Sequence, residues 1–161
     1  MQPVMRVRLV DVPVALFCAA EQHTNDLLRE VALMAAGRSD LEVGHLFSEM
    51  LSSADAYAHR PAAVRQHLAE AVTLALSEGR ESVTVDVQAD AAAAEGARMW
   101  EELLRRFDAM SRDEQLLTLP ADPEVTAYRA WYARELLEQV QTGRAPVSWQ
   151  VARLDALAGA R

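Results

Sequence analysis

The chain has 161 residues, of which 51% are hydrophobic and 25% charged, a composition typical of a globular protein and unlike that of a disordered one. Acidic residues outnumber basic ones by 24 to 16, and the resulting net charge of −8 repels nucleic-acid phosphates and anionic membranes. We therefore expect neither nucleic acid nor a membrane as the main partner.

Cysteine usage and the absence of targeting signals indicate a cytoplasmic protein. Cys18 is the single cysteine, so the chain cannot form an internal disulfide. The first residues lack the basic region and apolar core of a secretory signal, and no stretch approaches the roughly 20 apolar residues of a membrane span. No linker-like or low-complexity stretch divides the chain, which predicts a single domain over 1–161.

The first half of the chain predicts one strand followed by three helices. Residues 5–10 alternate apolar and charged side chains, which is typical of a strand with one exposed face. The helices follow from apolar residues spaced three and four apart, with breaks at Gly37, at Pro61 and at Gly79. We expect them at about 13–36, from a cap at Asp40 to the break at 59–61, and from about 64 to 79.

The second half begins with the clearest strand of the sequence. Residues 82–88 alternate valine with polar side chains. Residues 114–119 are a short apolar run that predicts either a strand or an extended segment. Helices are expected at about 90–110, from Pro123 with Asp122 as its cap to Gly143, and at about 148–158.

These elements predict a predominantly helical α+β fold, with about five helices and a small two- or three-stranded sheet. Two strands alone form a marginal sheet. We therefore expect the sheet to be completed by packing against helices or by a further strand near 115–119.

Motifs for catalysis, cofactors and metals are missing. The six glycines are too dispersed for a phosphate-binding loop, and no serine lies in a G-x-S-x-G turn. Glu42 and His45 have the i, i+3 spacing of a di-iron ligand pair, but the chain lacks a second such pair. One cysteine and four separated histidines fit no zinc spacing. We expect no cofactor, no metal and no catalytic residues, which favours a protein that is not an enzyme.

His23 is the most notable ionisable residue, because it lies beside the apolar stripe of the first helix. The favoured interpretation is a hydrogen-bonded histidine at the boundary of the core. The alternative is a pocket in which Glu21, His23 and Asp26 carry out proton transfer or pH-sensitive binding.

The helix predicted from Pro123 is rich in aromatic residues. The favoured interpretation is structural, with Trp131 and Trp149 holding the final helix against this one. The alternative is a partner-binding patch of Arg129, Trp131 and Arg134, since Trp, Tyr and Arg dominate interface hot spots.

Several runs resemble a family of small actinobacterial proteins. Residues 7–17 and 21–30 resemble the opening of that family, whose corresponding helix reads EHHDELLREF, and residues 116–125, 129–132 and 143–149 resemble its C-terminal half. The resemblance implies association with anti-sigma-factor and ATP-binding proteins of stress signalling. Residues 119–123 also resemble a strand-to-helix step of anti-sigma kinases, but the nucleotide-binding motifs that would follow are missing. Thr24 stands where the family has a histidine.

We therefore expect a non-enzymatic regulatory protein that binds another protein, for which an anti-sigma kinase or a related regulator is the candidate that the resemblance implies. Wide apolar helix faces also favour a homodimer. The alternative function is a small-molecule sensor or enzyme whose pocket surrounds His23.

Overall fold

A computed structural model describes residues 3–37 and 42–159, with side chains described from Phe47 onward in the second range. The expected cap at Asp40 and the side chains of Glu42 and His45 therefore lie outside the described residues. The elements in chain order are β1 (Met5–Pro13), α1 (Val14–Gly37), α2 (Glu42–His59), α3 (Ala62–Ser77), β2 (Ser82–Ala89), α4 (Ala91–Arg112), α5 (Pro123–Thr142) and α6 (Trp149–Gly159).

The predicted α+β class is confirmed, with one difference in the number of helices. The described residues form six helices, where the sequence predicted about five, and one antiparallel sheet in which β1 pairs with β2. Each of these described helices is too short or too polar to cross a membrane.

The two strands bury one face of the sheet, as their alternating residues predicted. Val7 lies opposite Val87, and Leu9 lies opposite Val85, all of them buried. β1 continues beyond the predicted end at residue 10, because the register shifts between Leu9 and Val12 and pairing then resumes. Asp11 adopts a left-handed φ of 58° in this bulge, and its N–H donates to Thr84 Oγ1 at 3.1 Å.

Residues 114–119, for which the sequence left a strand or an extended segment open, form no third strand. Within the described residues, 113–122 run between α4 and α5 without regular structure. The physical reason is that Glu30 of α1 accepts hydrogen bonds from the N–H groups of Leu117 and Thr118, which a neighbouring strand would otherwise use.

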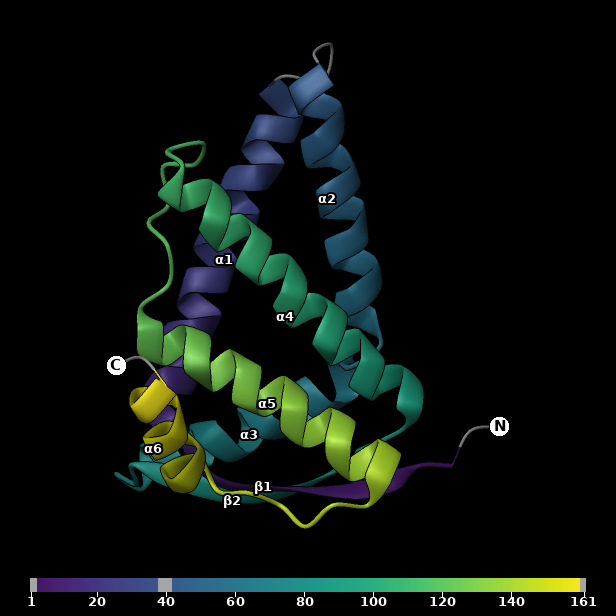
Figure 1. The fold of residues 1–161 in the computed structure, drawn as a ribbon, viewed down its shortest axis with the longest axis vertical. Helices are drawn as coiled ribbons and strands as arrows, with labels where there is room; N and C mark the ends of the chain where they lie inside the picture. The colour runs from purple at the N-terminus through teal and green to yellow at the C-terminus, as the bar shows by residue number, and fades with distance from the viewer. Residues whose placement is uncertain (1–2, 38–41, 160–161) are drawn as a thin grey trace.

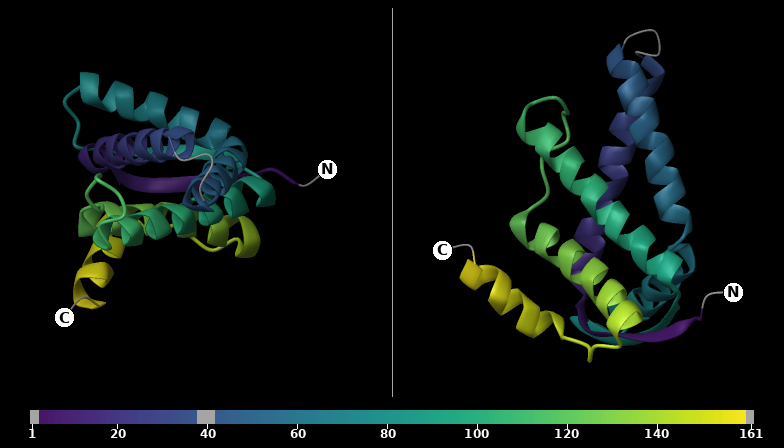
Figure 2. Two further views of the ribbon diagram at one scale, coloured as in Figure 1. Left: turned by 90° about the horizontal axis from the view of Figure 1, so that it is seen from above. Right: turned by 45° about the vertical axis from the view of Figure 1, so that its right-hand side comes forward.

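The helices surround α1 above the sheet. Figure 1 shows the two strands at the base of the molecule, α1 and α2 rising from it side by side, and α4 and α5 crossing in front. Viewed from above in Figure 2, α3 lies on one side of α1 and the strands, while α4 and α5 lie on the other. Helix α1 is therefore in a position to contact side chains from both layers.

Local capping explains where α4 and α5 begin and end. Asp90 accepts a hydrogen bond from the Ala93 N–H at 2.8 Å, and Asp122 accepts one from the Glu124 N–H at 2.9 Å. Pro123 occupies the first turn of α5. Gly143 ends the helix at a left-handed φ of 65°, a conformation that glycine adopts without steric cost. The caps of α5 at Asp122 and Gly143 were predicted from the sequence and are confirmed, whereas the cap of α4 at Asp90 was not predicted.

The apolar core consists of two clusters. One lies on the sheet and combines residues of both strands with α3, α5 and the first turn of α6. The other lies between the far part of α1, α2 and α4, and includes Leu27, Phe47 and Phe107. Helix α1 contributes to both, with Ala20 in the first cluster and Leu27 in the second. His23 thus lies at the level where one cluster gives way to the other.

Candidate functional site

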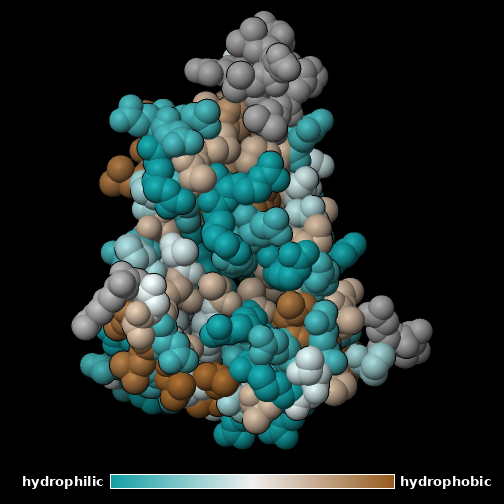
Figure 3. All heavy atoms as spheres, in the orientation of Figure 1, coloured by the Kyte–Doolittle hydropathy of each residue, from teal (hydrophilic) through white to brown (hydrophobic). Residues whose placement is uncertain are grey.

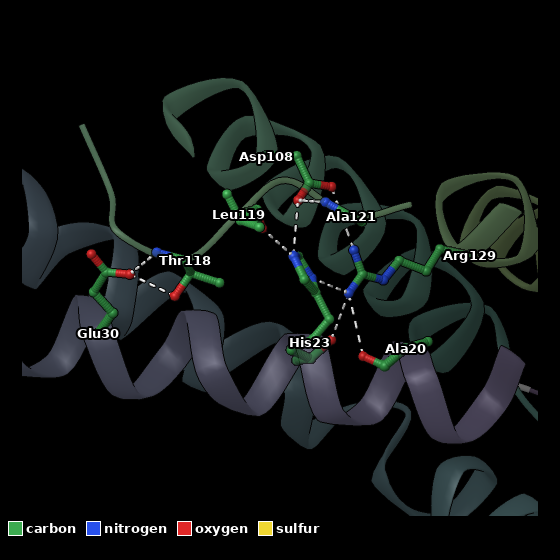
Figure 4. Close-up of polar contacts among 9 residues, drawn as sticks. Ala20, His23, Glu30, Asp108, Thr118, Leu119, Ala121 and Arg129 are labelled. Carbon is green, nitrogen blue, oxygen red and sulfur yellow. Dashed lines mark hydrogen bonds and ion pairs between the residues drawn. The ribbon is translucent and has the colours of Figure 1, made fainter. Parts of the chain in front are cut away.

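A buried polar cluster occupies the boundary between the two apolar clusters. It joins His23 of α1, Asp108 of α4 and Arg129 of α5 (Figure 4). The exposed fractions of the three side chains are 16%, 4% and 8%. Charged groups this deeply buried are stable only with polar partners, which makes the geometry of the cluster informative.

Arg129 donates hydrogen bonds to Asp108, Thr24 and Ala20. Its Nη1 lies 3.5 Å from Asp108 Oδ2, and its Nη2 lies 3.0 Å from Thr24 Oγ1 and 3.3 Å from the carbonyl oxygen of Ala20. Burial lowers the pKa of Arg129 from its ordinary value and Asp108 raises it, but an arginine guanidinium remains protonated in proteins. The guanidinium is therefore a fixed positive charge with donors only.

The contacts of Arg129 determine which nitrogen of His23 carries the proton. His23 Nδ1 lies 3.0 Å from Arg129 Nη2, and because a guanidinium cannot accept, Nδ1 must be the unprotonated acceptor. His23 Nε2 lies 2.7 Å from the carbonyl oxygen of Leu119, so this nitrogen is the donor. Asp108 Oδ1, 3.6 Å away, favours the same N–H orientation. The geometry thus describes a neutral imidazole protonated on Nε2 alone.

The polar cluster also holds the segment of residues 113–122 against the helices. His23 donates to the carbonyl of Leu119, and Asp108 Oδ1 accepts from the N–H of Ala121 at 3.0 Å. Glu30 accepts from the Leu117 N–H and, at 2.6 Å each, from the Thr118 N–H and hydroxyl (Figure 4). Three side chains from two helices therefore fix the backbone of one irregular segment.

The Glu30 contact predicts a specific dependence of stability on pH. Partial burial raises the pKa of Glu30, but the hydrogen bonds from Thr118 and Leu117 lower it by more, so the pKa lies below its ordinary value of 4.5. A lowered folded-state pKa gives stabilisation that is present above the unfolded-state pKa and is lost as the pH falls through the folded value. Glu30→Gln should therefore cost about 1.5 kcal/mol at pH 7 and progressively less below about pH 4.5.

The measurement is urea unfolding of the two proteins from pH 7 to pH 3. The exposed Glu49→Gln of α2 serves as the control and should follow the original protein at every pH. A constant difference between Glu30→Gln and the original protein across this range would contradict the role assigned to the carboxylate.

A small cavity lies on the other side of Arg129, between α1, α3, α4 and α5. Its volume is about 50 Å³. We call it the Trp100 cavity, and it is lined by Phe17, Ala20, Glu21, Thr24, Arg65, Leu68, Ala97, Trp100, Glu101, Leu104, Tyr128, Arg129 and Tyr132. The Tyr132 hydroxyl and Arg129 Nε are buried and have no hydrogen-bond partner among the described residues.

The structure places Glu21 on a different side of α1 from His23, and Asp26 outside the contacts of either residue. Glu21 lines the Trp100 cavity and pairs with Arg65 at 3.3 Å, whereas His23 contacts Leu119 and Arg129 on another side of α1. Asp26 accepts from Gln22 at 3.0 Å, outside both sites. The physical reason is helix geometry, since residues two, three and five positions apart at 100° per residue cannot all face one cavity.

Two of the three predicted partner-binding residues are buried. Trp131 is 1% exposed and Arg129 belongs to the polar cluster, while Arg134 is exposed. The structural interpretation of the tryptophans is confirmed: the Trp131 ring lies 5.8 Å from that of Trp149, and Trp131 Nε1 donates to the carbonyl of Val147 at 2.9 Å. Neither Trp131 nor Arg129 thus offers its side chain to a partner in this structure.

Sequence reasoning overlooked Asp108, Glu30 and Trp100. The sequence did contain a signal for Asp108, because Leu104, Asp108 and Ser111 have the spacing of one helix face. The structure shows that all three residues on this face are buried. An acidic residue on a buried face requires a buried partner. Its partner Arg129 lies 21 residues away on another helix, so the pairing itself had no local signal.

Comparisons of the chain with known protein families, curated proteins and solved structures found no match. Among the described residues, no group of three His, Cys, Asp or Glu side chains could hold a metal ion. Function must therefore be argued from the chemistry of the polar cluster, the 113–122 segment and the Trp100 cavity.

Proposed function

We propose that this chain is a non-enzymatic regulatory protein that binds another protein through Leu117 and Leu119. The observation that carries the proposal is that these two leucines are 93% and 78% exposed although the Leu117 N–H is held by Glu30 and the Leu119 carbonyl by His23. Exposed apolar side chains on a fixed segment are suited to enter an apolar surface on a partner.

Rigidity supports this proposal because ordering a flexible loop on binding costs free energy. Glu30, His23 and Asp108 already hold the segment in one conformation, so little further ordering is needed when a partner binds. A groove of about 550 Å³ also adjoins the segment, lined on one side by Leu33 and Met34 of α1. An apolar side chain of the partner would fit beside Leu117 there.

The partner that we propose is a protein with an apolar binding surface, and the resemblance described above favours an anti-sigma kinase or a related stress-signalling regulator. We also propose that the interaction takes place in the cytoplasm, where a chain with one cysteine and no disulfide is stable in reduced form.

The test compares surface variants that leave the core unchanged. Leu117→Ser combined with Leu119→Ser should abolish capture of the partner from lysate of the native host, quantified by mass spectrometry. Both side chains are exposed, so the change in the free energy of unfolding should stay within about 0.5 kcal/mol.

The control removes a second exposed apolar row of similar size. Val151, Leu154 and Leu157 are exposed along α6. Hydrophobic surface is visible at the lower left of Figure 3, where α6 lies in Figure 1. Leu154→Ser combined with Leu157→Ser should retain the captured partner. Loss of capture in this variant alone would assign the interface to α6 and contradict the role of the 113–122 segment. Absence of any protein enriched over a tag-only bait would contradict the proposed function itself.

A further inference from the structure

A second cavity, larger than the Trp100 cavity, lies between α2 and α4. Its volume is about 210 Å³, compared with about 50 Å³ for the Trp100 cavity. We call it the α2–α4 cavity, because all the residues that line it belong to these two helices. It is therefore separate from the polar cluster around His23 and from Leu117 and Leu119, which carry the proposed protein-binding function.

The packing of α2 and α4 explains where this cavity opens. A Cβ atom at Gly96 would lie 2.9 Å from Arg60 Cβ, so glycine is required for the close approach of α4 to the residues that follow α2. Towards the other end of the helix pair, the rings of Phe47 and Phe107 are buried in the apolar cluster that both helices share. The residues that line the cavity lie between these two contacts along both helices.

The floor of the cavity is apolar. Met50 and Leu103 are buried, with 5% and 4% exposed, and the side chains of Met99 and Tyr57 that also line the cavity are half-buried. Displacing water from such side chains by an apolar group is favourable, and methionine adapts its shape to the group that it contacts. The floor therefore favours a ligand with an apolar part.

Two opposite charges from different helices lie at this cavity and are not paired with each other. Glu49 of α2 and Arg106 of α4 both line it and are exposed, and within the part of the chain that the structure describes neither forms an ion pair. One turn before Arg106, Glu102 pairs instead with Arg98 at 3.1 Å. The cavity thus offers one negative and one positive group to a ligand, which favours a ligand that carries both charges.

The volume limits the size of this ligand. A cavity of about 150 Å³ holds benzene, a molecule of six non-hydrogen atoms, so about 210 Å³ corresponds to about eight such atoms. Zwitterionic valine has this size. Its branched apolar side chain lies at one end of the molecule, and its ammonium and carboxylate groups lie at the other.

We propose that the α2–α4 cavity binds a small zwitterionic amino acid with an apolar side chain, such as valine. Its ammonium group pairs with Glu49 and its carboxylate with Arg106, while its side chain packs on Met50 and Met99. Arginine suits this role because its planar guanidinium holds a carboxylate through two parallel hydrogen bonds. The site adds a small-molecule ligand to the proposed protein-binding function and does not depend on it.

Valine, isobutylamine and 3-methylbutanoate test this assignment, because they share the branched apolar part and differ in charge. The readout is the methionine methyl signals in a ¹H–¹³C NMR titration. We expect valine to shift the signals of Met50 and Met99. Isobutylamine, which lacks the carboxylate, and 3-methylbutanoate, which lacks the ammonium group, should bind at least about fivefold more weakly. The signals of Met34 and Met110 should remain in place, since neither residue lines the cavity.

Two arginine variants of α4 locate the contact. Arg106→Gln keeps a long polar side chain at an exposed position, so the fold should be retained while valine binds about fivefold more weakly. Isobutylamine should not lose affinity for this variant, because it has no carboxylate for Arg106 to hold. Arg112→Gln, at an exposed arginine of the same helix outside the cavity, is the control and should bind valine as the original protein does.

Three results would overturn the assignment: binding of isobutylamine or 3-methylbutanoate as tight as that of valine, unchanged valine affinity in Arg106→Gln, or no saturable shift of the Met50 and Met99 signals with valine. None of these affects the protein-binding proposal, which depends on Leu117 and Leu119 and is measured with different variants.

Discussion

Replacing Trp131 by alanine is expected to lower the free energy of unfolding by about 3–5 kcal/mol. Trp131 is 1% exposed and packs between Tyr128, at 5.9 Å between ring centroids, and Trp149, at 5.8 Å. The substitution leaves a cavity in the cluster on the sheet and removes the hydrogen bond from the indole to Val147. The contact between α5 and the start of α6 should loosen as a result.

Urea unfolding followed by circular dichroism measures this effect. Arg134→Ala is the control, because Arg134 lies on the same helix and is exposed, so its replacement should change the free energy of unfolding by no more than about 0.5 kcal/mol. A Trp131→Ala protein as stable as the original, combined with loss of partner capture, would restore Trp131 as a surface anchor and contradict its position in the core.

Replacing Glu135 by alanine should destabilise the protein by a similar amount, about 3–5 kcal/mol, through a different mechanism. Glu135 is fully buried within α5 and accepts from Gln139 Nε2 at 2.9 Å and from the Val147 N–H at 3.0 Å, and it also pairs with Arg144. Its carboxylate therefore holds the segment between α5 and α6. Alanine would remove the acceptor of the partly buried Val147 N–H and of one N–H of the Gln139 amide, whose nitrogen also donates to the Arg8 carbonyl.

The neighbouring Glu138→Ala is a suitable control for this variant. Glu138 pairs with Arg144 at 2.7 Å but is 39% exposed, so its replacement should cost less than about 1 kcal/mol. We also expect trypsin to cleave after Arg144 faster in Glu135→Ala than in Glu138→Ala, because the segment is released. Equal cleavage rates and equal stability of the two variants would contradict the role assigned to Glu135.

Features that depend on neighbours in sequence were predictable. The cap at Asp122 and the end of α5 at Gly143 depend on residues within one turn, and the structure agrees with both predictions. The buried face of the sheet followed from alternating valines in 82–88, because the side chains of a strand point to opposite faces in turn. Local spacing was also sufficient to identify the helical α+β class.

Features that depend on distant residues were not predictable from the same patterns. The apolar run at 114–119 has the composition of a strand, and only the carboxylate of Glu30, 87 residues from Leu117, shows why its N–H groups do not pair with one. Arg129 resembled a surface residue beside exposed Arg134, yet it is buried because Asp108 and Thr24 provide the partners that a buried guanidinium needs.

The helices, both strands, the Asp122 cap and the absence of familiar catalytic motifs therefore follow from residues close together in the chain. Which polar side chains are buried together depends instead on contacts between distant helices. His23, Asp108 and Arg129 come from three helices and are up to 106 residues apart. Their pairing depends on how α1, α4 and α5 pack. A buried charge is stable only where that packing places a hydrogen-bonding or oppositely charged partner beside it.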